Sequence, residues 1–522
     1  MVHIENLSVS FEDTEAVKNV NLHIAPGEIL GVVGESGSGK SVTALTLMGL
    51  VSDEAVITSG RIVLDGATLV EAGKPRDKAL YRAYQGSRMS MIFQEPMTSL
   101  NPTKTVGKQI EEMLKLHTRL DLEARRKRVV ETMESVGLKN PGKLYGCYPH
   151  ELSGGMRQRV MIAMAVILHP DVIVADEPTT ALDVTIQNQI MTLLKEINEK
   201  EKNAMLFITH DLNLARRICD RIVVMKNGQV VESGTTEEIF ERPKQEYTQM
   251  LIEAVPSRLK PKADIAGGKD AEDSEPVVSV ANLNVYYKES TGGLLGRKYD
   301  RCVVEDANFV IGKGEIVGLV GESGCGKSSL SKAVLGMNKN IKGSVDHTSV
   351  RPQMIFQDPY SSLNPSRTVS WLLQEPLRAA AKLDPALQMT KEQMENAALE
   401  MLRKVGLDES YMNRKPSQLS GGQRQRISIG QALITRPQLV IADEPVSALD
   451  VTLQAQIMEL MRSLQQELGV SYLFISHDIN VVYQMCDRIM VMKDGKIIEQ
   501  GKTEDIFNHP KESYTELLLR ES

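Results

Sequence analysis

The sequence predicts an α/β fold that is written twice in one chain of 522 residues. Apolar runs of strand length are followed by helical patterns, which is typical of α/β domains. A glycine-rich GxxxxGK[ST] loop follows such a run at Gly34 and again at Gly321. In addition, residues 151–183 return at 418–450 without a gap, and more than half of the aligned positions are identical. A chain of this length is too long for one core, so two or more domains are expected.

The composition is that of an ordinary globular protein, with 42% hydrophobic and 25% charged residues. A net charge of −7 argues against a broad nucleic-acid surface. The five cysteines form no CxxC pair, so neither a metal cluster nor a disulfide framework is predicted, as is typical of a reducing cytosol. The longest apolar run near the motifs, residues 160–168, is far shorter than the roughly 20 residues of a membrane span. Because this run is too short, we expect no bilayer crossing. The start of the chain has neither a basic head nor an apolar signal region.

The first half begins with apolar residues at alternating positions over 2–9, which predicts a strand near a sheet edge. Residues 28–33 are almost all apolar, as expected of a buried parallel strand, and they lead into the glycine-rich loop. Residues 56–72 predict a short β-region, and the charged helical pattern over 106–136 predicts an added helical subdomain. An Asn-Gly pair at 227–228 predicts a tight hairpin.

The glycine-rich loops are predicted to bind phosphate. Glycines let backbone N–H groups close around phosphate oxygens, Lys40 reaches the β- and γ-phosphates, and the Ser41 hydroxyl can ligate Mg²⁺. The predicted ATP-binding residues of the two loops are Gly34, Glu35, Ser36, Gly37, Ser38, Gly39, Lys40, Ser41 and Val42, and Gly321, Glu322, Ser323, Gly324, Cys325, Gly326, Lys327, Ser328 and Ser329.

Other strands end on polar residues in both halves. In the first half these are Gln94, the adjacent acids Asp176 and Glu177, and His210; in the second they are Gln357, Asp443, Glu444 and His477. An isolated Asp-Glu pair is more often a helix cap or a turn, and an isolated histidine is more often structural. The interval from glutamate to histidine is the same in both halves, which favours a functional role.

The spacing of the motifs divides the chain into residues 1–253, a linker at 254–276 that is rich in Pro, Gly and charge, and residues 277–522. The offset between the glycine loops is 287, that between the glutamines is 263, and that between the glutamates and between the histidines is 267. The second half is therefore shorter by 24 between loop and glutamine (287 − 263) and longer by 4 in the helical region (267 − 263). We expect it to lack most of the small β-region at 56–80.

With these motifs in this order, the chain resembles the ATP-binding-cassette (ABC) ATPases over nearly its whole length. The segments FQEPMTSLNP and FQDPYSSLNP, with LSGGMRQR and LSGGQRQR, are similar to those of the oligopeptide, dipeptide and nickel importers. The resemblance implies two tandem ABC ATPase domains, each with a RecA-like P-loop core, an antiparallel β-subdomain and a helical subdomain. It also implies that the halves pair head to tail around two ATP molecules and Mg²⁺.

The resemblance implies a role for each matching residue. Glu177 and Glu444 would orient or deprotonate the attacking water, and His210 and His477 would contact the γ-phosphate. The implied metal ligands, direct or through water, are Ser41, Gln94, Asp176, Ser328, Gln357 and Asp443; the two glutamines also belong to the ATP site. The signature turns that would bind the nucleotide of the other half are Ser153, Gly154 and Gly155, and Ser420, Gly421 and Gly422.

The aromatic residue that stacks on adenine is expected shortly before each glycine loop. The offset from Phe11 to Gly34 is 23, and the offset from Tyr299 to Gly321 is 22. In the second half Tyr286 and Tyr287 compete with Tyr299.

The expected function is an ATP-hydrolysing, energy-coupling subunit of a bacterial ABC importer for peptides or related small solutes such as nickel chelates or glutathione-like peptides. Two transmembrane permease subunits, a solute-binding protein and a peripheral position on the cytoplasmic face of the membrane are implied, without a nucleic-acid partner. The alternative is a soluble double ABC ATPase that acts on ribosomes or DNA; the short, nearly neutral linker argues against it. A regulator that does not hydrolyse ATP would lack a base, and neither half does.

Overall fold

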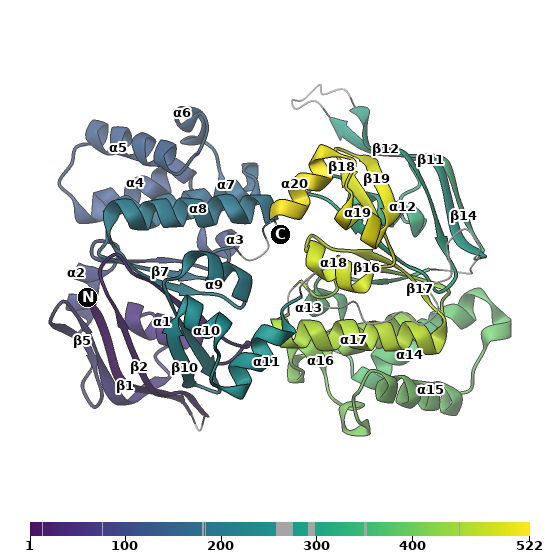
Figure 1. The fold of residues 1–522 in the computed structure, drawn as a ribbon, viewed down its shortest axis with the longest axis horizontal. Coiled ribbons are helices and arrows are strands. Elements are labelled where there is room, and N and C mark those ends of the chain that lie inside the picture. The colour runs from purple at the N-terminus through teal and green to yellow at the C-terminus, as the bar shows by residue number, and fades with distance from the viewer. Residues whose placement is uncertain are drawn as a thin grey trace. The chain divides into compact units, whose positions relative to one another are not determined.

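The computed structural model describes residues 1–12, 14–75, 77–179, 182, 184–256, 275–290, 298–348, 352–447 and 449–521. Most of the linker predicted at 254–276 lies outside these residues. The chain divides into two compact units, one made mainly of residues 1–255 and the other mainly of residues 256–522. Each unit is described by itself below (Figure 1).

A six-stranded sheet forms the centre of the first unit. In order across the sheet, its strands are β10 (Gln229–Thr235), β9 (Arg221–Lys226), β3 (Ile29–Val33), β8 (Ala204–Ile208), β7 (Val172–Asp176) and β6 (Met89–Ile92). Neighbouring strands are parallel, except that β10 is antiparallel to β9. Every residue of β3, β7 and β8 is buried, because both faces of the sheet are covered.

The two faces of this sheet belong to different hydrophobic cores. Ile29 and Val33 pack in the core shared with the helical region, whereas Leu30 and Val32 pack in the core shared with the antiparallel sheet. This second sheet has the order β2 (Thr14–Ile24), β1 (Val2–Phe11), β4 (Ala55–Leu64), β5 (Ala67–Glu71). As predicted, β1 lies near an edge of this sheet: it is the second strand, next to the edge strand β2, and it pairs with both β2 and β4. Its alternating pattern reflects one buried face rather than an unpaired edge.

The helices of the first unit complete both cores. Figure 1 shows α4, α5 and α6 gathered beside α7, as the predicted helical subdomain requires. The helices are α1 (Lys40–Met48), α2 (Lys78–Tyr84), α3 (Pro96–Ser99), α4 (Val106–His117), α5 (Leu122–Ser135), α6 (Pro141–Leu144), η1 (Pro149–Glu151), α7 (Gly154–Val166), α8 (Val184–Glu201), α9 (Leu212–Ile218), α10 (Thr236–Glu241) and α11 (Glu246–Ala254).

The second unit repeats the central sheet in the same order. Its strands are β19 (Lys496–Lys502), β18 (Arg488–Lys493), β13 (Ile316–Val320), β17 (Ser471–Ile475), β16 (Leu439–Asp443) and β15 (Gln353–Ile355). The antiparallel sheet has three strands, β12 (Lys298–Gly312), β11 (Pro276–Ser290) and β14 (Ile341–His347). No counterpart of β5 or α2 occurs in the described residues between β14 and β15.

The helices of the second unit follow those of the first. They are α12 (Lys327–Val334), α13 (Pro359–Ser362), α14 (Val369–Leu383), η2 (Pro385–Leu387), α15 (Lys391–Lys404), η3 (Glu409–Tyr411), η4 (Pro416–Gln418), α16 (Gly421–Leu433), α17 (Val451–Leu468), α18 (Ile479–Met485), α19 (Thr503–Asn508) and α20 (Ser513–Glu521). Within the described part of the chain, no helix combines the length and the apolar character needed to span a membrane.

Candidate ATP site in each unit

The phosphate loop of the first unit links the end of β3 to the start of α1. Gly34 has a φ of 146°, and a Cβ there would lie 2.2 Å from the carbonyl oxygen of Met225, so only glycine fits. Gly39 has a φ of 96° and precedes the first turn of α1. The loop backbone is therefore held in a conformation that directs N–H groups towards an anion at the start of a helix. The second unit repeats this geometry at Gly321 and Gly326, with φ values of 153° and 113°.

The lysine of each loop folds back onto its own backbone. The Nζ of Lys40 donates to the carbonyl oxygens of Gly34 at 2.8 Å and Glu35 at 2.7 Å. The Nζ of Lys327 does the same with Gly321 and Glu322, at 2.7 and 2.9 Å. Burial lowers the pKa of Lys40, although Glu177 and other nearby acids oppose this shift. Both ammonium groups thus lie beside the place where phosphate oxygens would bind.

Each loop serine contacts the aspartate at the end of a neighbouring strand. The Ser41 hydroxyl donates to Asp176 at 3.1 Å, and Ser328 donates to Asp443 at 3.5 Å. Burial raises the pKa of Asp176 to about 6, and burial followed by repulsion from Glu444 raises the pKa of Asp443. A buried carboxylate that is costly to ionise gains most from a nearby cation.

The serine hydroxyl and aspartate carboxylate of each unit are suitable ligands for Mg²⁺. The described residues contain no group of three His, Cys, Asp or Glu side chains that could hold a metal. Mg²⁺ does not require such a cage, because it keeps several waters and is usually held by one or two carboxylates together with phosphate oxygens. The serine hydroxyl and the aspartate carboxylate of each unit are therefore enough protein ligands for Mg²⁺ bound to a nucleotide.

A glutamate next to each aspartate lies between a glutamine and a histidine. Glu177 accepts a hydrogen bond from Gln94 Nε2 at 2.8 Å, and its carboxylate lies 3.1 Å from His210 Nδ1. Glu177 also has a φ of 46°, in the left-handed region that non-glycine residues rarely adopt. Strained backbone of this kind is common at functional sites.

The second unit builds the same group around Glu444. Gln357 Nε2 donates at 2.7 Å and His477 Nδ1 lies at 3.2 Å, while the φ of Glu444 is 48°. Burial opposes the charged form of both partners. The hydrogen bond and the charge of the partner outweigh burial, so the pKa of Glu444 is lowered and that of His477 is raised. The lowered pKa favours the ionised form of Glu444 where the four strand ends of this unit meet.

The signature turns lie at the starts of α7 and α16. The Ser153 hydroxyl accepts the N–H of Met156, and the Ser420 hydroxyl accepts the N–H of Gln423. Both serines are exposed, and a Cβ at Gly155 would come within 2.6 Å of Ile186. Each turn therefore offers an exposed helix start, the kind of structure that binds anions. Their hydrogen bonds run within their own helices.

The antiparallel sheets show which aromatic residue of the second half corresponds to Phe11. Phe11 pairs with Thr14, and Tyr287 pairs with Arg301 in the same register, three positions before Val17 and Val304. Thr14 and Arg301 precede their loop glycines by the same interval. Tyr299 lies further out along the hairpin, where its hydroxyl donates to Glu289 at 2.7 Å. The repeated pattern Asn-Leu-x-Val-x-aromatic at 6–11 and 282–287 is the sequence signal for this match.

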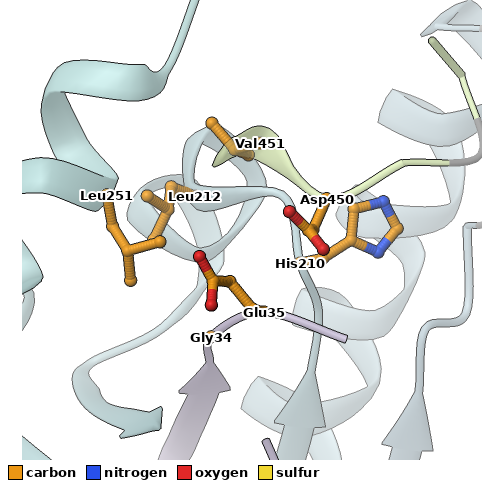
Figure 2. A pocket seen from close by; sticks show the side chains of 7 residues that line it. All are labelled: Gly34, Glu35, His210, Leu212, Leu251, Asp450 and Val451. Carbon is orange, nitrogen blue, oxygen red and sulfur yellow. The ribbon is translucent and has the colours of Figure 1, made fainter. Parts of the chain in front are cut away.

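The pocket at the first phosphate loop places charged and apolar residues together. Figure 2 shows Glu35 directly after Gly34, with Leu212 and Leu251 on one side and His210 on the other. Leu251 belongs to α11, which no sequence motif connects with the loop.

Comparison with known proteins agrees with this geometry. The family model "ABC transporter" matches residues 17–180 and 304–447, and the model "Oligopeptide/dipeptide transporter, C-terminal region" matches residues 231–277 and 498–521. The "Peptidoglycan transport ATP-binding protein YejF" of Agrobacterium fabrum is 40% identical, with 99% of this chain and 96% of the relative covered. The "Glutathione import ATP-binding protein GsiA" of Pectobacterium atrosepticum is 41% identical, with 99% and 89% covered.

A solved structure of an archaeal ribosome recycling factor, aABCE1, matches 94% of this chain with a TM-score of 0.59. The match covers 88% of the solved chain at 20% identity, so it supports the tandem fold and says nothing about ribosomes. The family models and the relatives together show that the chain belongs to the ABC transporter family, as a fused pair of ATP-hydrolysing cassettes that each carry the C-terminal region of the oligopeptide/dipeptide transporters.

Proposed function

We propose that this chain drives the uptake of peptides or related small solutes by hydrolysing ATP at two sites. The observation that carries the proposal is the complete and duplicated group of lysine, serine, aspartate, glutamate, glutamine and histidine in the two units. The names of the relatives support the cargo class, because peptidoglycan and glutathione both contain peptide units. Two permease subunits and a solute-binding protein complete the proposed importer, with the chain on the cytoplasmic face of the membrane.

At each site, the residues described above would divide the chemistry among them. Ser41 and Asp176, or Ser328 and Asp443, would hold Mg²⁺, which neutralises charge on the phosphates. Glu177 or Glu444 would orient and deprotonate the attacking water, while the adjacent glutamine and histidine keep the carboxylate in place. The phosphate-loop lysine would turn from its carbonyl partners to the nucleotide.

Separate replacement of the two glutamates tests whether both sites hydrolyse ATP. A general base contributes about 10²–10⁴-fold at its own site. Glu177→Gln and Glu444→Gln should therefore each remove at least about half of the turnover, provided that both sites contribute equally. The exposed Glu241, which pairs with Arg216, gives the control variant Glu241→Gln. Wild-type turnover in either site variant would show that the corresponding site does not contribute.

We further propose that the halves pair head to tail, so that the signature of one serves the nucleotide of the other. The family resemblance supports this arrangement. Ser153→Arg should then reduce nucleotide trapping at the site of Lys327, whereas Lys40→Ala should reduce trapping at its own site. The opposite pairing in a site-resolved trapping experiment would contradict the proposal.

Transport assays test the cargo class. Cells that lack this chain should lose uptake of labelled di- and tripeptides, glutathione or peptidoglycan fragments, and the wild-type gene should restore it. The purified complex should contain permease subunits. Unchanged uptake of all these solutes together with co-purification of ribosomes would favour the alternative function instead.

A further inference from the structure

The C-terminal helix of each unit places a buried tyrosine against the phosphate loop. The Tyr247 hydroxyl of α11 accepts the backbone N–H of Glu35 at 3.5 Å, and the Tyr514 hydroxyl of α20 accepts the N–H of Glu322 at 3.1 Å. The tyrosines are 7% and 6% exposed. The offset between the tyrosines is 267 (514 − 247), whereas that between the glutamates is 287 (322 − 35). The contact is therefore kept in both units although the chain between its two ends differs in length.

A lysine of the neighbouring hairpin lies over each tyrosine ring. The Nζ of Lys226 lies 4.2 Å from the centroid of the Tyr247 ring, and the Nζ of Lys493 lies 4.7 Å from that of Tyr514. Both distances are within the range of a cation–π interaction. The ring is thus fixed by packing and charge, so its hydroxyl is held in one position.

The same hairpin also holds the other end of the loop. The N–H of Gly228 donates to the carbonyl oxygen of Ser38 at 3.1 Å, and the N–H of Gly495 donates to that of Cys325 at 2.9 Å. Each phosphate loop is therefore supported at its second residue by the tyrosine and at its fifth residue by the hairpin.

An acidic side chain anchors the segment that carries the tyrosine. The Glu232 carboxylate accepts the N–H groups of Lys244 and Gln245 at 2.8 and 3.1 Å, just before α11. In the second unit Glu499 accepts those of Lys511 and Glu512 at 2.8 and 3.2 Å. Glutamate, anchored helix start and tyrosine all lie inside the two segments matched by the C-terminal family model.

We propose that Tyr247 and Tyr514 are positioning residues that preorganise the phosphate loops for ATP. A glycine-rich loop loses much conformational freedom when it closes around phosphates, and a loop fixed in advance loses less on binding. The hydroxyl holds the N–H of the second loop residue, so the following N–H groups stay turned towards the phosphates. The tyrosines do not touch the reacting atoms. The inference rests on the proposed ATP site and assigns a purpose to the C-terminal region.

The test removes only the two hydroxyls, in the full chain. Tyr247→Phe combined with Tyr514→Phe should weaken binding of MgATP about five-fold per site, the loss expected for one hydrogen bond. The KM for ATP should rise by a similar factor, while kcat changes less than about two-fold because the chemistry is untouched. Hydrogen exchange at the N–H groups of residues 34–39 and 321–326 should become faster.

Tyr145→Phe is the matched control, since Tyr145 is a half-buried tyrosine whose hydroxyl donates to Glu111 at 2.6 Å in the helical region. It should leave the affinity for MgATP and the exchange of both loops unchanged. Unchanged MgATP affinity in the double variant, with a fall in Tm like that of the control, would overturn the inference and leave the tyrosines a structural role only. Failure of the proposed ATP site looks different: MgATP would then bind equally well to the wild-type chain and to a chain with Lys40→Ala and Lys327→Ala.

Discussion

Tyr287, rather than Tyr299, should support the adenine of the nucleotide bound to the second phosphate loop. The register of β11 and β12 puts Tyr287 where β1 places Phe11, and the Tyr287 side chain is 38% exposed, so part of it is available to a ligand. Stacking of a base on an aromatic ring contributes roughly 1–3 kcal/mol. Tyr287→Ala should therefore weaken ATP binding at this site by roughly 5- to 150-fold.

The assay isolates the second site by combining each replacement with Lys40→Ala and measures the Kd for MgATP. Tyr299→Ala is the matched control, because it removes an exposed tyrosine of the same hairpin whose hydroxyl bonds to Glu289. It should change the Kd less than about two-fold, as expected for a surface residue outside the site. Replacement of a surface tyrosine should also leave the unfolding temperature nearly unchanged.

The opposite result would refute the register argument. If Tyr299→Ala weakens binding and Tyr287→Ala does not, the adenine lies further out along the hairpin, as the spacing to Gly321 alone suggests. If neither replacement changes the Kd, the register argument also fails, and Tyr286 is the remaining candidate for the residue that stacks on adenine.

The other predictions concern stability and the metal. Gly31→Ala should lower the free energy of unfolding by about 1–3 kcal/mol through overpacking, because its Cβ would lie 2.7 Å from Cys219 Sγ. A second replacement, Cys219→Ala, should restore most of the lost stability in thermal unfolding. If stability is not restored, backbone strain is the cause instead. Burial disfavours the charged form of Glu499, but hydrogen bonds from the backbone N–H groups of Lys511 and Glu512 outweigh it and lower its pKa below 4.5. The contribution of the ionised Glu499 carboxylate to the free energy of unfolding is therefore present above pH 4.5 and lost as the pH falls through the lowered pKa. Glu499→Gln should lower the free energy of unfolding in urea by about 1 kcal/mol at pH 7 and by less at pH 4. An equal loss at both pH values would contradict this assignment. EDTA should abolish ATP hydrolysis without lowering the Tm of the nucleotide-free chain, because the serine–aspartate bonds form without the ion; hydrolysis that persists in EDTA would exclude the proposed Mg²⁺ site.

The fold could be predicted from the sequence because its strongest determinants are local. Continuous apolar runs such as 28–33 mark buried parallel strands, and each is followed by a loop whose glycines and lysine have a defined purpose. The Gln94, Glu177 and His210 group could also be anticipated, since each residue ends a strand and the ends of parallel strands meet at one edge of a sheet. The repeat then supplied a second, independent instance of the same arrangement.

Two parts of the site depend on geometry that spacing does not contain. The hairpin between Tyr287 and Arg301 is longer than its counterpart between Phe11 and Thr14, and counting back 23 from Gly321 ends inside it (321 − 23 = 298). The count therefore leads to the neighbouring Tyr299, while the strand register leads to Tyr287. The Tyr247 contact gave no signal, because a tyrosine on a short amphipathic helix is expected to be a core residue. Only the folded chain brings it to a loop 212 residues away.

Comparison of the two units shows which contacts are the same in both sites and which lengths of connecting chain differ. The serine–aspartate bond spans 135 residues in the first unit and 115 in the second, and the glutamine–glutamate bond spans 83 and 87. Insertions and deletions between the strands have changed every one of these spans, yet the same atoms meet. The glutamine, aspartate and glutamate lie at or just after strand ends, and the serine lies at the start of the helix that follows β3 or β13. The strand ends are set by the parallel register of the central sheet rather than by the connecting chain. A shift of one strand by a single residue would point these side chains to the opposite face, so changes in loop length are tolerated where changes in register are not.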